Sequence, residues 1–105
     1  MFVGDPGEWD DDMLWTMDVA ECEDGSFEMF YTGLQLEERG VNQRVGRAVS
    51  KDLINWDKTF PNDLPIESEA PHYEDINNNP RTWLSFRDPF LYKNKELEYL
   101  LICAR

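Results

Sequence analysis

The chain has 105 residues, of which 41% are hydrophobic and 13% aromatic, which is enough to build the core of one small domain. Its 22 acidic and 10 basic side chains give a net charge of −12. This charge repels nucleic-acid backbones and anionic membranes and excludes both as expected partners, whereas a neutral sugar, a cation or a basic protein surface stays compatible with it.

The first 58 residues predict four successive β-strands that fold into one antiparallel meander. The first predicted strand is rich in β-forming side chains and alternates loosely with period two. Glu23-Asp24-Gly25 is a hairpin-turn signal, a polar loop follows Gly33, and Lys51-Asp52-Leu53 is expected to form a short turn. The strands are expected at residues 14–22, 26–32, 43–50 and 54–58.

Residues 59–84 predict an irregular linker, because four prolines and the run Asn77-Asn78-Asn79 interrupt any regular pattern. Strand signals return at residues 86–92 and 97–104, on either side of a charged turn. Residues 85–105 therefore predict a single hairpin.

The hairpin repeats the arrangement of the first unit, a strand, a charged turn and an aromatic-rich strand. Repeated four-stranded meanders are the units of β-propellers. We therefore predict an all-β fold that is a partial β-propeller. It would have one complete four-stranded antiparallel blade (residues 1–58), the linker (residues 59–84) and the inner hairpin of the next blade (residues 85–105).

Three motifs, in this order, carry a resemblance to a known group of enzymes. They are Met29-Phe30-Tyr31-Thr32-Gly33, the run over residues 43–58, and Phe86-Arg87-Asp88-Pro89. Together with the segment around Trp9-Asp10-Asp11 and Leu14-Trp15-Thr16, they resemble the second and third blades of the five-bladed propeller glycoside hydrolases of families 32, 43 and 68.

The resemblance implies that Asp88 is the carboxylate that stabilises the transition state, with Arg87 orienting it. Glycoside cleavage needs further carboxylates at controlled separations, and we identify none of them in the sequence. We therefore expect a fragment of a glycoside hydrolase for furanoside or xyloside sugars that is inactive as an isolated chain. The alternative is a non-catalytic carbohydrate-binding or self-assembling blade module.

The predicted substrate-binding residues are Arg87 and three residues of an inner strand that faces the channel in the propeller interpretation, Trp15, Thr16 and Asp18. Trp15 would stack on a sugar, and Thr16 and Asp18 would contribute polar contacts. A competing interpretation makes Trp15 a core residue and Asp18 a cap on a neighbouring strand. For Asp88, the competing interpretation is a structural ion pair with Arg87.

Other acidic residues are weaker candidates. Asp5 superficially resembles a first-blade nucleophile, and Glu21 an acid/base residue, but both stand in the wrong order relative to Asp88. Residues Asp10 to Asp12 could bind calcium, although a solvated acidic turn is the preferred interpretation. We expect no metal and no cofactor.

Cys22 and Cys103 are expected to be buried, reduced thiols, because a disulfide requires an oxidising compartment. His72 is interpreted as an incidental loop residue and Trp56 as packing between blades. The first residues have neither the basic nor the apolar part of a signal peptide, so a cytoplasmic location is expected. Exposed blade faces and edges predict a homo-oligomer or a complex with a complementary propeller chain.

Overall fold

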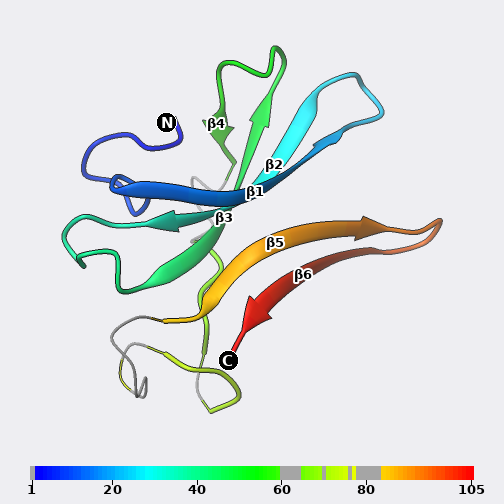
Figure 1. Cartoon of the computed structure of the whole chain (residues 1–105). Coiled ribbons are helices and arrows are strands. Elements are labelled where there is room, and N and C mark those ends of the chain that lie inside the picture. Colours follow the sequence, from blue (N-terminus) through cyan, green and yellow to red (C-terminus); the bar gives the residue numbers. More distant parts are fainter. Residues whose placement is uncertain (1, 60–64, 70, 76, 78–83) are drawn as a thin grey trace.

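The computed structural model describes residues 2–59, 65–69, 71–75, 77 and 84–105, and the described part consists of strands, turns and loops. Six strands form a four-stranded antiparallel sheet, in the order β1-β2-β3-β4, and a separate two-stranded hairpin, β5-β6 (Figure 1). The strands are β1 (Met13–Glu21), β2 (Phe27–Leu34), β3 (Gln43–Ser50), β4 (Asp57–Lys58), β5 (Phe86–Lys93) and β6 (Glu98–Ala104). The predicted all-β class and both antiparallel units are confirmed.

The fourth strand is shorter than predicted, because residues 51–56 belong to the turn before it. The Asp52 carboxylate accepts hydrogen bonds from the backbone N–H groups of Ile54 and Asn55, at 2.9 and 2.8 Å. Those bonds, led by the one from Asn55, hold the pKa of the Asp52 carboxyl well below its usual value of 3.8. Leu53 takes a φ of 64°, which a strand does not allow.

One face of the four-stranded sheet is covered by the N-terminal segment, and we call it the Trp9 face. The Trp9 ring stacks on Tyr31 at 5.5 Å and lies directly over Gly33 and Gly46. A Cβ atom at either glycine would come within 2.4 to 2.5 Å of that ring. The glycines therefore create the slot that Trp9 fills. Met29, Ala48 and Trp56 complete this cluster.

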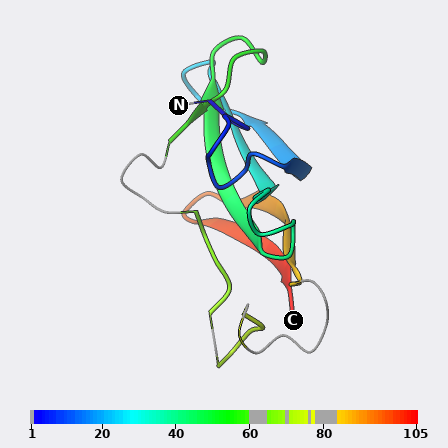
Figure 2. The ribbon, with the colours of Figure 1, turned by 90° about the vertical axis from the view of Figure 1, so that its left-hand side faces the viewer.

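The opposite face, which we call the hairpin face, packs against β5 and β6. Val45 of β3 is fully buried there with Leu84 and Phe86, and side chains of β6 line the same cluster. Figures 1 and 2 show the hairpin at one end of the molecule, with the N-terminal segment and β4 at the other. The hairpin is thus held by one face of the larger sheet.

The predicted linker is partly attached to this sheet. Ile66 and Val45 exchange two backbone hydrogen bonds, of 2.8 and 3.0 Å. The Arg44 guanidinium, nearly buried, binds both Glu67 and Glu38 at 2.6 Å. Residues 60–64, 70, 76 and 78–83 of the linker lie outside the described residues.

The prediction of two buried thiols is wrong. Both cysteines are free, Cys22 is half-buried and Cys103 is exposed. Cys103 alternates along β6 with the inward-facing Ile102 and Ala104, so it faces outward. No helix in the described part of the chain is long and apolar enough to cross a membrane.

Candidate functional site

A bulge in β5 holds Asp88 in an unusual conformation. Arg87 pairs with Cys103 and Phe90 with Leu101, so Asp88 and Pro89 together face a single residue of β6. Such bulges redirect side chains, and proline fits there because the ladder needs no N–H group from it. Asp88 has a φ of 59°, in the left-handed region. This conformation costs about 1–2 kcal/mol for an L-residue, although aspartate tolerates it better than most.

A second bulge lies in β1. Leu14 pairs with Gly33 and Met17 with Tyr31, so Trp15 and Thr16 share the space opposite Thr32. Both bulged residues are exposed, Trp15 to 38%. The bulge therefore presents an indole ring and a hydroxyl group to solvent.

Thr32 joins the two bulges. Its side chain is fully buried between them, and its hydroxyl oxygen accepts a hydrogen bond from the backbone N–H of Asp88 at 3.1 Å. Because this bond uses the backbone amide of Asp88, the Asp88 carboxylate takes no part in it. One buried threonine of β2 thus anchors the β5 bulge and lies opposite the β1 bulge in register.

Side chains of the larger sheet also cover the free edge of β5. Gln43 accepts from the N–H of Phe86 at 3.0 Å, and Asp18 accepts from the N–H of Leu91 at 2.8 Å. With the Thr32 bond, three amides along one edge of β5 are satisfied by side chains. Their spacing is two residues and then three, because the bulge adds one residue. A further strand could not pair with this edge without displacing these bonds.

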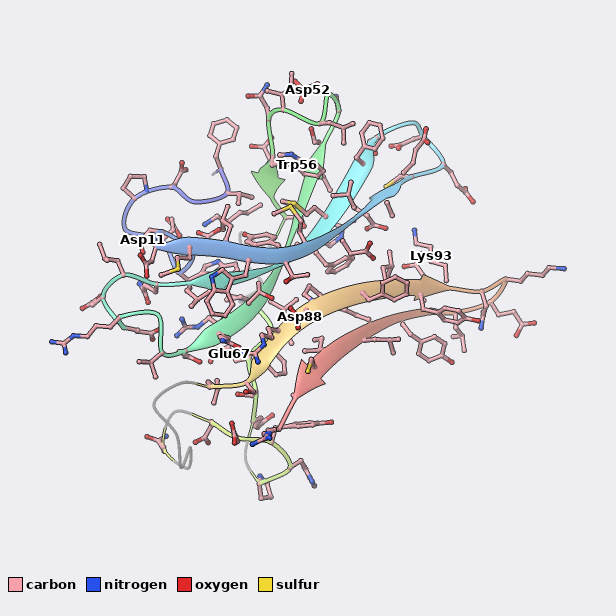
Figure 3. The ribbon with its side chains drawn as sticks, in the orientation of Figure 1. Asp11, Asp52, Trp56, Glu67, Asp88 and Lys93 are labelled. Atoms are coloured by element: carbon pink, nitrogen blue, oxygen red, sulfur yellow. The ribbon has the colours of Figure 1, made fainter. Side chains whose placement is uncertain are left out.

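Arg87 and Asp88 form a loose ion pair. The Arg87 Nε atom lies 3.8 Å from Asp88 Oδ2, which is too long for a hydrogen bond. The two side chains are 31% and 45% exposed, and pairs of this kind contribute at most about 1 kcal/mol. The Asp88 carboxylate therefore keeps its capacity to accept hydrogen bonds from a ligand. Figure 3 shows it on β5 beside the four-stranded sheet.

The five predicted site residues occupy two strands that contact each other, β1 and β5. Trp15 is exposed at its bulge, so the core interpretation is wrong for it. Asp18 is bound to the backbone of β5, as the competing interpretation expected. The sequence reasoning missed the role of Thr32, although this residue belongs to the motif Tyr31-Thr32-Gly33. Its partner is 56 residues away, which no local pattern can indicate.

The weaker carboxylate candidates lie elsewhere. Glu21 is exposed at the far end of β1, five residues and about 17 Å along the strand from Thr16. The Asp5 carboxylate accepts a hydrogen bond from the N–H of Phe2 at 2.9 Å, in the segment that covers the Trp9 face. His72 is exposed in a described part of the linker. Neither carboxylate stands beside Asp88.

The interpretation of Asp10 to Asp12 as a solvated acidic turn is wrong for Asp10. Its carboxylate is fully buried and accepts hydrogen bonds from the Tyr31 hydroxyl at 2.8 Å and the Lys58 ammonium at 2.5 Å. Burial and the bond to Asp10 raise the pKa of the Tyr31 hydroxyl far above its usual value of 10.0. Among the described residues, no group of three or more His, Cys, Asp or Glu side chains is placed to hold a metal ion.

No known protein family, no curated protein and no solved structure matches the chain. The features on which a function can be argued are the Asp88 carboxylate at the β5 bulge anchored to Thr32, the Arg87 guanidinium beside it, and the Trp15 indole at the β1 bulge.

Proposed function

We propose that the two bulges form a sugar-binding site of the propeller glycoside hydrolase type, for furanoside or xyloside sugars, in which Asp88 contacts the substrate. The observation that carries this proposal is the strained bulge at Asp88, anchored to Thr32 through its amide while its carboxylate stays exposed. Strained residues that the surrounding structure holds in place cluster at functional sites.

The proposed chemistry follows from the side chains present. The Asp88 carboxylate accepts hydrogen bonds from sugar hydroxyls, and its negative charge stabilises the positive charge that develops on the sugar ring during cleavage. Trp15 offers an exposed indole face for stacking on the ring. Arg87, 31% exposed and loosely paired with Asp88, orients the carboxylate and contributes guanidinium N–H donors beside this acceptor.

A partial propeller is part of the same proposal. The four-stranded sheet would be one blade and the hairpin the inner part of the next, joined to it through a shared apolar cluster. The covered edge of β5 supports this assignment, because the innermost strand of a blade has a neighbour on one side. β6, on the other side of the hairpin, would be where that blade continues.

Cleavage requires two carboxyl groups about 5–5.5 Å apart in retaining enzymes, or about 6.5–9.5 Å apart in inverting ones. Glu21 and Asp5 do not stand beside Asp88, and Asp18 is bound to the backbone of β5. The chain therefore contributes Asp88 to a site that other carboxylates complete, and it has little turnover alone. The same observation favours a second candidate, a non-catalytic sugar-binding module.

Titration calorimetry with arabino-, fructo- and xylo-oligosaccharides, together with turnover of the corresponding aryl glycosides, tests both candidates. Asp88→Asn removes the charge and keeps a residue that tolerates the left-handed region. We expect it to weaken binding at least about tenfold, by loss of a charge-assisted hydrogen bond. Asp57→Asn, which changes an exposed carboxylate on β4, is the matched control.

The outcomes separate the candidates. Turnover that Asp88→Asn abolishes supports the hydrolase, and binding without turnover supports the module. If the unmodified chain binds none of these sugars, or if Asp57→Asn weakens binding as much as Asp88→Asn, the sugar site is not at Asp88.

A further inference from the structure

The outer face of the hairpin carries an unpartnered apolar surface, which we call the head. Phe90 lies opposite Leu101, and Tyr92 lies opposite Tyr99. Each of the four side chains is about half exposed, and the two tyrosine rings lie 6.3 Å apart. They alternate with the inward-facing residues that pack on the larger sheet. The head is thus a contiguous aromatic and aliphatic sheet face.

A second apolar surface lies on the Trp9 face, and we call it the tail. Phe2, Leu14, Met17 and Ile54 are exposed there. Together with Trp56 and three further residues they line a groove of about 430 Å³. Contiguous apolar patches of this kind on a folded chain mark interaction surfaces.

The chain itself shows what packs against such faces. Its hairpin face is covered by the inner face of β5 and β6, with Val45 of the sheet buried against Phe86 and Ile102. This face of the larger sheet thus already accepts apolar side chains of the hairpin, while its polar side chains bind the edge of β5. The head lies on β5 and β6, whereas the tail lies on β1, the N-terminal segment and the turn before β4, so the two surfaces share no residue.

The distribution of charge favours a contact between a head and a tail over a contact between two tails. Residues 85–105 contain four basic and three acidic side chains, a net charge of +1, whereas residues 1–84 contain six basic and 19 acidic ones, a net charge of −13. The segment beside the tail, residues 2–12, contains no basic side chain and four acidic ones besides Asp10, whose charge is paired with Lys58. Two tails facing each other would therefore repel, whereas a head facing a tail brings together the only weakly positive part and the acidic part.

We infer that this chain binds further copies of itself head to tail, with the head of one copy packed on the tail of the next. The contact is heterologous: each copy uses one surface to bind and offers the other. Such contacts do not stop at two copies but continue until the arrangement closes into a ring, or grow as an open filament. This inference does not depend on the proposed sugar site.

Two variants that each block one surface test the inference. Leu101→Glu places a charge in the head, and Met17→Glu places one in the tail; both residues are about half exposed, so the fold should tolerate the change. Leu36→Glu, in an exposed loop outside both surfaces, is the matched control. Sedimentation velocity and light scattering give the mass, and circular dichroism checks the fold.

We expect the unmodified chain and Leu36→Glu to form assemblies that grow with concentration, and each blocked variant to be monomeric alone. An equal mixture of Leu101→Glu and Met17→Glu should form a dimer and stop there, because one intact head meets one intact tail. A monomeric unmodified chain at micromolar concentration overturns the inference. So does a mixture that stays monomeric, or a blocked variant that still forms dimers alone.

Discussion

The four-stranded sheet and the hairpin are stabilised in different ways. Strands β2 and β3 are buried on both faces, and the Trp9 face contains a fully enclosed ion pair between Asp10 and Lys58. The hairpin buries only its inner face and is attached through side chains that accept hydrogen bonds from its backbone. The larger sheet therefore supplies most of the stability. Its side chains also hold the hairpin, and with it Asp88, in position.

The largest loss of stability is expected at the buried ion pair between Asp10 and Lys58 in the larger sheet. Asp10→Asn leaves the Lys58 ammonium, whose side chain is 5% exposed, with only the more distant Glu8 carboxylate, at 3.9 Å, as a counter-charge. We expect the free energy of unfolding to fall by about 3–5 kcal/mol, as when one partner of a buried ion pair is removed. Urea denaturation measures it, with Asp57→Asn as the control. Amide protection should fall in both units, and a loss below about 1 kcal/mol would show that the ion pair is not what supports the sheet.

A smaller and local effect is expected at the junction. Thr32→Val keeps the shape of the side chain but removes the acceptor for the Asp88 amide. We expect a loss of about 1–2 kcal/mol, since a donor loses its partner. Hydrogen exchange should quicken at Asp88 and in β5 while β2 and β3 stay protected. Thr16→Val, which changes an exposed threonine, is the control and should have little effect. If Thr32→Val instead reduced protection equally in all strands, the larger sheet would not be what holds the hairpin in position.

The strain at Asp88 can be measured separately from its chemistry. Glycine adopts a φ of 59° freely, whereas alanine does not, and both remove the carboxylate. We expect Asp88→Gly to be more stable than Asp88→Ala by about 1 kcal/mol. Thermal unfolding of the two variants gives this difference. Equal stabilities would mean that the bulge relaxes when the side chain changes, and that the larger sheet does not impose it.

The smallest effect concerns the ionic contact between the two units. Burial raises the pKa of Glu28, but hydrogen bonds from Lys93 and Arg47 outweigh it and hold the pKa below its usual value of 4.5. Because the folded-state pKa is lowered, this contribution is present above about pH 4.5 and is lost as the pH falls through the folded-state value.

The expected result is that Glu28→Gln lowers stability at pH 7 and differs less from the unmodified chain at pH 3. The size should be about 1 kcal/mol or less, since Lys93 and Arg47 are both partly exposed. Denaturation at the two pH values measures it, with Glu23→Gln in the exposed turn as the control. A difference that grows on acidification would have the wrong sign for a lowered pKa.

Much of the fold could be predicted from local patterns. The alternation of side chains and the turn at Asp24-Gly25 correctly predicted the meander and the hairpin, with ends that differ by a few residues at most except in the fourth strand. That strand was overestimated because its apolar Ile54 and Trp56 resemble a strand, whereas the Asp52 carboxylate binds the backbone of the turn. Local hydrogen bonding competed with the strand pattern and prevailed.

The candidate site was predictable only in part. The sequence motif drew attention to Asp88 and Arg87, and the strand pattern to Trp15, Thr16 and Asp18. Neither bulge could be predicted from the sequence, because a bulge is defined by the register of a partner strand. The burial of Asp10 was equally hidden, since an acidic run looks solvated until Lys58, 48 residues later, is folded against it.

The strands, their antiparallel order and the acidic charge follow from side-chain type and from spacing over a few residues. Tertiary structure alone decided which faces meet. It placed Trp9 over two glycines on neighbouring strands and Thr32 beneath Asp88, and it left the head and the tail uncovered. Those outcomes depend on contacts between segments that are distant in the sequence, and such contacts form only in the folded chain.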